Sequence, residues 1–121
     1  MPKGQLDIKL KEVNDIKVVD LEGAIDASNV SDFQSIVGHL CEEEQPLVLL
    51  DCTGLSYVNS TCFGLFFQYN RACSRRGGAF ALCSVWDKIS HLIKLLGLHK
   101  FLNLYPDRET ALKALRTKRR L

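Results

Sequence analysis

The chain has 121 residues, of which 46% are hydrophobic and 25% charged, and its formal net charge is +2. This length predicts one domain whose core needs no metal or cross-link, and the composition is that of an ordinary globular protein. The net charge is too small to favour nucleic-acid binding. No apolar run approaches the roughly 20 residues that span a bilayer, so membrane insertion is not expected.

The N-terminal residues and the cysteines bear on the compartment. Residues 1–7 lack the apolar core of a signal peptide, which predicts a cytoplasmic protein. The five cysteines are odd in number and never form a C-x-x-C pair, so we expect small buried thiols rather than a disulfide framework or a zinc site. The histidines show no metal-ligand spacing, and no G-x-x-x-x-G-K-[ST] loop could hold a nucleotide. The sequence therefore predicts neither a metal nor a cofactor.

Two strands are predicted at the N-terminal end. Apolar residues alternate over 6–10 and recur over 16–21, and Asn14-Asp15 lies between these runs where a tight turn is needed. We therefore expect an antiparallel pair.

A helix and a buried strand follow. A cap signal over 26–28 opens a stripe with the spacing of one helix face, and this helix should end before Pro46. The stripe consists of Val30, Phe33, Ile36, Val37, Leu40 and Cys41. The continuous apolar run 47–51 then predicts a strand with both sheet faces covered by helices.

A second helix is predicted over about 60–76, and it should end at Gly77-Gly78. Its expected core face is Cys62, Leu65, Phe66, Tyr69, Ala72 and Cys73. The next strand should cover 79–85.

A third helix should stop at Gly97 and bury Ile89, Leu92, Ile93 and Leu96. A short strand is expected at 101–105. Pro106 then opens a last helix that carries Ala111, Leu112 and Leu115 on its apolar side.

This order of elements, β-β-α-β-α-β-α-β-α, predicts an α/β fold. The central sheet should be mostly parallel, with an antiparallel N-terminal edge pair and about four helices. The predicted domain spans 6–115, between an N-terminal tail at 1–5 and a basic C-terminal tail at 116–121. Basic residues at such an end are more typical of a solvated tail than of a nucleic-acid-binding arm.

The predicted start of the second helix carries two neighbouring hydroxyls, Ser60 and Thr61. A helix N-terminus leaves backbone N–H groups unpaired and carries the positive end of the helix dipole. A hydroxyl there can cap the helix, and it can also carry a phosphate. The residues alone leave both interpretations open.

Three segments of the chain form a recognisable pattern: Glu22-Gly23-Ala24-Ile25-Asp26, residues 49–61, and Gly97-Leu98 with the strand and helix that follow. Together they resemble the STAS family, the domains of anti-sigma factor antagonists. The first is similar to the family's G-x-[LI]-D motif after the second strand, the second to its central strand with the D-[ST]-[ST]-G loop, and the third to its C-terminal end. The resemblance covers about 6–115.

The resemblance implies a phosphorylation site. In the family, a serine kinase that is also the anti-sigma factor phosphorylates the first hydroxyl residue of the loop, which here matches Ser60, with Thr61 as the alternative. The chain departs from the family pattern at Asn59, where Asp is common, and at Cys62, where Gly is common. Losing the carboxylate removes a charge beside the acceptor, and losing glycine constrains the backbone.

We therefore expect a regulatory binding protein, not an enzyme, that binds an anti-sigma factor kinase and is controlled at Ser60. One alternative is a STAS subunit of a stressosome-like or transporter-associated complex that is never phosphorylated. Another is a thiol redox sensor at Cys62, whose pKa a helix dipole can lower, although core packing also explains this cysteine. The oligomeric state and the identity of the partner stay open.

Asp26, Phe63 and Phe67 complete the predicted partner-binding set with Asn59, Ser60 and Thr61. Asp26 should lie near the Ser60 loop, either to position it for a kinase or to cap the first helix. Phe63 and Phe67 lie beside the core stripe of their helix. They either pack against a neighbouring helix or form an apolar patch for the partner.

Overall fold

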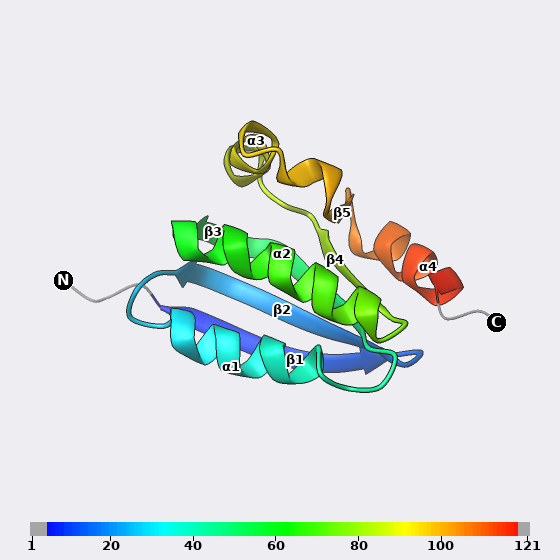
Figure 1. The fold of residues 1–121 in the computed structure, drawn as a ribbon. Coiled ribbons are helices and arrows are strands. Elements are labelled where there is room, and N and C mark those ends of the chain that lie inside the picture. Colours follow the sequence, from blue (N-terminus) through cyan, green and yellow to red (C-terminus); the bar gives the residue numbers. More distant parts are fainter. Residues whose placement is uncertain (1–4, 119–121) are drawn as a thin grey trace.

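Five strands form one mixed sheet in the computed structural model, which describes residues 5–118. The strands are β1 (Leu6–Val13), β2 (Ile16–Ile25), β3 (Leu47–Val58), β4 (Ala79–Cys83) and β5 (Asn103–Tyr105). They lie side by side in chain order (Figure 1). β1 pairs antiparallel with β2, and all other neighbours are parallel. The predicted α/β class and the antiparallel edge pair are confirmed.

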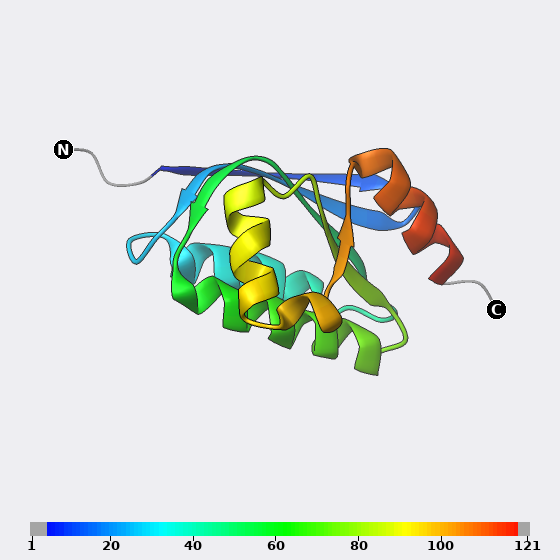
Figure 2. The same cartoon turned by 90° about the horizontal axis from the view of Figure 1, so that it is seen from above.

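Helices connect the parallel strands, because a parallel crossover has to return the chain to the same end of the sheet. They are α1 (Val30–Leu40), α2 (Ser60–Arg75), α3 (Asp87–Leu95) and α4 (Arg108–Lys118), with a short 3₁₀ turn, η1 (Leu98–Lys100). Figure 2 shows α1 and α2 on one side of the sheet and α4 at its other side.

Each face of the sheet has its own core. The larger core lies under α1, α2 and the inner side of α3, and the rings of Phe33, Phe66, Tyr69 and Phe80 are buried in it. The smaller core lies under α4, where Ala111 and Leu115 pack on the sheet. All five cysteines are buried, as the sequence predicts.

Several element boundaries differ from prediction. β3 continues to Val58, seven residues beyond the predicted run, and β4 ends at Cys83. The predicted strand 101–105 is only 103–105, because η1 and the turn after it occupy the preceding residues. α4 extends to Lys118, so residues 116–118 are helix rather than tail. The rest of both predicted tails, 1–4 and 119–121, lies outside the described residues.

α3 buries less than its pattern predicts. Ile89 and Ile93 are buried, but Leu92 and Leu96 are exposed. The two buried residues are four apart, so α3 contacts the core along one narrow line. The prediction that Leu92 and Leu96 belong to the core is therefore wrong.

A partly buried ion pair fastens α4 to the sheet. Asp51 on β3 is 6% exposed and is the only buried charged residue in the range 5–118. It accepts hydrogen bonds from the Thr53 backbone N–H at 3.0 Å, the Thr53 hydroxyl at 2.7 Å and Arg108 Nε at 2.8 Å. Arg108 also pairs with Asp20 on β2. The first residue of α4 is thus bound to two strands.

The electrostatics of Asp51 match this arrangement. Burial alone would raise the pKa of its carboxyl, but hydrogen bonds from Thr53 and Arg108 outweigh burial and hold that pKa below its usual value. The carboxylate is therefore charged at neutral pH and depends on these donors.

We expect Arg108→Gln to destabilise the fold by about 1–3 kcal/mol, because it removes a charged donor from a buried carboxylate. Arg116→Gln makes the same charge change on an exposed residue of the same helix and should alter stability by less than about 0.5 kcal/mol. Urea denaturation measures both. Equal effects of the two substitutions on the free energy of unfolding would show that the ion pair of Arg108 with Asp51 contributes nothing to stability beyond the change in net charge.

Candidate functional site

The second half of β3 projects beyond β4 and β5. Its pairing with β4 ends at Asp51↔Cys83, whereas its pairing with β2 continues to Ile25↔Val58. The Asn59 backbone N–H then donates to the Ile25 carbonyl at 3.0 Å. The segments that follow β2 and β3 therefore lie side by side at the carboxyl edge of the strands, the edge where α/β sheets usually bind ligands and partners.

Asn59 immediately precedes α2 and caps it. Its backbone is extended, with φ −82° and ψ 171°, and its Oδ1 accepts from the Cys62 backbone N–H at 3.3 Å. Asparagine and aspartate cap helices about equally well, so this departure from the family pattern keeps the cap. Of the two interpretations left open for the hydroxyls of Ser60 and Thr61, capping therefore does not apply, because Asn59 is the cap.

Ser60 and Thr61 are instead the first two residues of α2, and both are exposed. The first turn of α2 carries no acidic residue. The positive end of the helix dipole is thus unopposed by a carboxylate within that turn, which favours an anion at these hydroxyls.

Asp26 lies in the neighbouring loop, as predicted, but it does not cap α1. Asn29 occupies the N-cap position. The Asp26 carboxylate accepts from the Ser28 backbone N–H at 2.9 Å and the Ser28 hydroxyl at 2.6 Å. The Asn29 side chain donates to the Ala24 carbonyl and accepts from the Asp26 backbone N–H, both at 3.0 Å. These bonds fix the loop next to Asn59.

The two phenylalanines of the predicted partner-binding set, Phe63 and Phe67, lie in different environments. Phe63 is 7% exposed and meets Phe66 edge to face at 6.2 Å in the larger core, so of its two interpretations packing applies and not an exposed patch. Phe67 is half-buried. Phe101 packs edge to face on its ring at 5.6 Å, and the Arg71 guanidinium lies 5.8 Å from its centroid.

Cys62 is fully buried. Burial raises the pKa of its thiol to about 11, and the hydrogen bond at the Asn59 backbone offsets only part of that rise. The thiol therefore stays protonated and covered at neutral pH, which argues against the redox-sensor alternative.

An exposed apolar surface that the sequence interpretation missed lies on α3 and the turn after η1. We call it the α3–η1 surface, and it consists of Leu92, Leu95, Leu96 and Phe101, which are 40%, 68%, 59% and 56% exposed. Exposed basic or imidazole side chains surround it: Lys88, His91, Lys94, His99 and Lys100. Four closely spaced apolar residues in 92–96 exceed what one helix stripe can bury, and that excess was the available signal.

The α3–η1 surface is tied to the elements that carry the Ser60 loop. The Phe101 carbonyl accepts from Asn70 Nδ2 of α2 at 2.6 Å. At the other end of α3, Trp86 Nε1 donates to the Thr53 carbonyl of β3 at 2.7 Å. The surface is therefore held against both β3 and α2.

No group of three or more His, Cys, Asp or Glu side chains within 5–118 is arranged to hold a metal ion. In the same part of the chain, every helix is too short or too polar to cross a bilayer.

Comparisons with known proteins agree on one family. The model of the STAS domain matches residues 7–111. The anti-sigma F factor antagonist of Paenibacillus polymyxa is 24% identical over 116 residues, which cover 91% of this chain and 95% of that protein.

Solved structures show the same fold. An anti-sigma factor antagonist from Mycobacterium paratuberculosis matches with a TM-score of 0.76 and 23% identity, over 93% of this chain and 95% of that one. The phosphorylated form of SpoIIAA, a Bacillus cell fate determinant, matches with a TM-score of 0.70 and 18% identity, over 91% of this chain and all of that one.

Replacing the cap tests the geometry of the α2 start. Asn59→Ala should destabilise the fold by about 1 kcal/mol, whereas Asn59→Asp should retain stability because aspartate accepts the same bond. Thermal or urea unfolding measures both variants. If Asn59→Ala were as stable as the parent chain, the Asn59 side chain would not be the cap.

Proposed function

The chain belongs to the STAS domain family, and on that premise we propose that it is an anti-sigma factor antagonist controlled by phosphorylation of Ser60. It binds an anti-sigma factor that is also a serine kinase, it acts in the cytoplasm, and it has no catalytic activity of its own. Binding sequesters the anti-sigma factor and so leaves the sigma factor free.

The observation that carries this proposal is the position of Ser60. Its hydroxyl is exposed at the first residue of a capped helix, where a kinase can reach it without unfolding the chain. A phosphate there would meet the positive end of the helix dipole and the unpaired N–H groups of the first turn. SpoIIAA, an anti-sigma factor antagonist of the same fold, has been solved in an unphosphorylated and a phosphorylated form.

Phosphate would act on the partner rather than on the fold. It adds about −1.5 to −2 charges at neutral pH, which the start of α2 can accommodate. A partner surface that is apolar or acidic where it meets Ser60 would lose affinity through desolvation and repulsion. Release then needs no large rearrangement of this domain.

The α3–η1 surface supplies the apolar contacts of the interface in this proposal. An exposed apolar patch rimmed by polar residues is typical of a protein–protein interaction site, and aromatic side chains such as that of Phe101 are enriched at such interfaces. The ring of Phe67 packs edge to face against the ring of Phe101, so Phe67 contributes to the interface by positioning the Phe101 ring. This arrangement assigns the affinity to α3 and η1 and the control of affinity to Ser60.

Asn59 and Asp26 shape the polar side of the interface in the same proposal. Asn59 sets the start of α2, and Asp26 holds the loop beside it through Ser28. Thr61 is the neighbouring hydroxyl and the alternative acceptor.

Incubation with ATP and each anti-sigma factor kinase of the source organism tests the acceptor. Mass spectrometry should locate one phosphate at Ser60, and Ser60→Ala should abolish the modification while the variant stays folded. Thr61→Ala is the matched control and should be modified normally. Phosphate on Thr61 would reassign the acceptor. A kinase that binds the chain but transfers no phosphate would favour the alternative of an unphosphorylated STAS subunit.

Leu95→Ala should weaken partner binding by more than about 1 kcal/mol and leave stability nearly unchanged, because the side chain is mostly exposed. Leu10→Ala, at a leucine of β1 that is also more than half exposed, is the control and should change neither quantity. Calorimetric titration measures the affinities. Equal affinities of the two variants for the partner would show that α3 is not part of the interface.

A further inference from the structure

The strand β1 has a free side along its whole length. The strand order gives β1 and β5 one neighbour each, so they are the two edges of the sheet. β5 has only three residues, whereas β1 has eight, contains no proline and pairs with β2 without a register shift. Natural edge strands are usually short, bulged or interrupted by proline, because their unpaired backbone groups otherwise recruit another strand. The outer side of β1 therefore suits the addition of a strand.

The hairpin between β1 and β2 identifies the backbone groups that point outward. Residues 14 and 15 have φ values of 50° and 69°, as a two-residue type I′ turn requires, and Val13 pairs with Ile16 across it. Such a turn is closed by a hydrogen-bonded pair, and bonded and non-bonded pairs then alternate along the ladder. The bond from the Ala24 N–H to the Gln5 carbonyl at 3.0 Å fits this alternation. The outward groups therefore belong to the even-numbered residues, which are Leu6, Ile8, Leu10 and Glu12.

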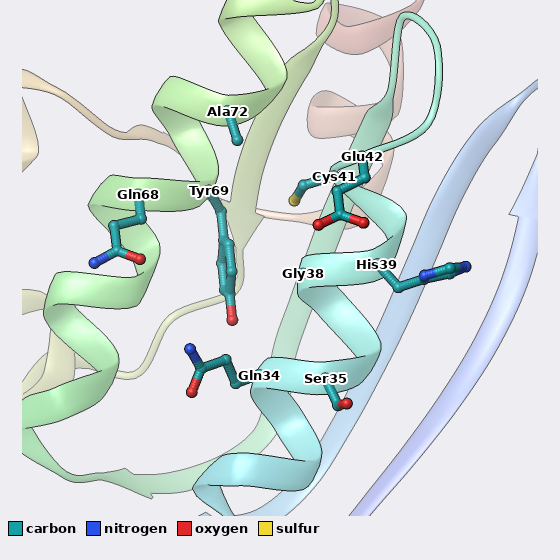
Figure 3. Close-up of a pocket in the computed structure, with 9 residues that line it drawn as sticks. All are labelled: Gln34, Ser35, Gly38, His39, Cys41, Glu42, Gln68, Tyr69 and Ala72. Carbon is teal, nitrogen blue, oxygen red and sulfur yellow. The ribbon is translucent and has the colours of Figure 1, made fainter.

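The apolar side chains of β1 lie on the face of the larger core. Leu6 and Ile8 pack against that core, but Leu10 on the same face is 54% exposed. Leu10 lines a cavity of about 390 Å³ whose other walls belong to α1: Ser35, Ile36, His39 and Leu40. Figure 3 shows His39 pointing from α1 away from α2, on the side of the two N-terminal strands. An apolar side chain placed beside Leu10 would remove this exposed surface from water.

Two charged side chains lie on the other face of β1. Neither Asp7 nor Lys9 has an ion-pair partner within residues 5–118. Asp7 stands directly opposite Glu22 of β2, and like charges in this position are destabilising. Lys9 stands opposite Asp20, whose carboxylate already pairs with Lys11. Residues 5–118 of one chain therefore leave a negative and a positive charge unpaired, two residues apart on one strand.

These charges select one register for two antiparallel copies of β1. The outward backbone groups of the two copies have to meet, which leaves only a few registers related by a two-fold axis. Centring the pair on Ile8 places Asp7 of each copy opposite Lys9 of the other. The neighbouring registers oppose like charges. Centring on Asp7 or on Lys9 sets that residue against itself, and centring on Leu10 sets Lys9 against Lys11.

The register centred on Ile8 also matches the apolar face and the backbone. Ile8 then faces Ile8, and Leu6 of each copy lies beside the exposed Leu10 of the other. These are the residues whose backbone groups point outward, so the two strands would exchange about six hydrogen bonds. Charge, apolar contact and backbone bonding thus agree on a single arrangement.

We propose that β1 pairs antiparallel with β1 of a second copy of this chain, centred on Ile8, and joins two sheets into one continuous sheet. A contact made through a single strand is small, so the dissociation constant should be about 10–100 µM. Figure 1 shows α3 on the opposite side of the molecule from β1, so the α3–η1 surface lies away from the seam. The inference goes beyond the proposed function, because it uses neither Ser60 nor that surface.

Sedimentation equilibrium of the whole chain over about 5–500 µM should show a monomer–dimer equilibrium. Asp7→Lys should weaken the dimer at least about tenfold, because it sets a lysine opposite Lys9 of the second copy. Within the monomer the same change gives Glu22 an opposite charge, so lost folding cannot explain the effect. Glu109→Lys makes the same charge change on an exposed residue of α4 and should leave the dimer unchanged.

Mixing two variants tests the register. Lys9→Asp should also weaken the dimer, because it sets an aspartate opposite Asp7 of the second copy. When the Asp7→Lys and Lys9→Asp chains are mixed, opposite charges face each other at both positions. The mixture should therefore form a heterodimer at least as tight as the parent homodimer. Thermal unfolding shows whether each variant is folded, and Asp7→Lys alone decides the test if Lys9→Asp is not.

Amide hydrogen exchange locates the contact in the parent chain. The amides of Ile8 and Leu10 point outward and should exchange several-fold more slowly at high protein concentration than at low. The Lys9 amide already bonds to β2 and should exchange at the same slow rate in both.

The proposal fails if the mass stays that of a monomer over the whole range, or if Asp7→Lys and Glu109→Lys weaken the dimer equally. It also fails if both folded variants remain monomeric when mixed. Protection of the Ile8 amide only after an anti-sigma factor is added would give this edge to that partner and overturn the proposal as well. The measurements on the chain alone do not involve Ser60, so their failure would leave the proposed function untouched.

Discussion

The pairing of β2 with the far half of β3 is the constraint on which the rest of this structure depends. Up to Asp51, β3 is an ordinary central strand with a neighbour on each side. Beyond Asp51 it is held within the sheet by β2 alone, as far as Val58. This pairing of β2 with β3 brings the loop after β2 next to the start of α2. The exposed Ser60 hydroxyl and the Asp26 loop owe their proximity to it.

The two faces of the sheet pack against different helices. Asp51 and Arg108 join β3, β2 and α4 on one face, where α4 covers the smaller core. On the other face, the larger core holds α1 and α2 and only one line of α3. The uncovered leucines of α3 are therefore exposed, and the bonds from Trp86 and Asn70 hold α3 and η1 against β3 and α2.

Periodicity predicted the order of elements, because strands of alternating or continuous apolar residues and helices with one apolar stripe leave clear patterns. It underestimated β3 because Thr53, Gly54 and Ser56 are typical of a turn. The register between β2 and β3 shifts here, and a Cβ on Gly54 would lie 3.0 Å from the Leu21 carbonyl oxygen. Close strand approach therefore explains the glycine better than a turn does.

The errors at the candidate site have a common physical origin. Residue spacing gives the direction of a side chain on its own helix, but it does not say what packs against that helix. Phe63 is buried because other elements of the larger core cover its side of α2. Leu92 is exposed because nothing within the described chain covers its side of α3. The bond between Arg108 and Asp51 joins residues 57 apart in sequence, beyond the reach of any local pattern.

The central claim is that one phosphate on Ser60 controls the affinity of an intact binding surface. Calorimetric titration of the anti-sigma factor kinase with the unmodified chain and with the chain bearing phosphoserine at position 60 measures this directly. We predict that the phosphate raises the dissociation constant at least about tenfold, equivalent to about 1.4 kcal/mol, while the melting temperature of the free chain hardly changes. Equal dissociation constants for the two forms would contradict the account.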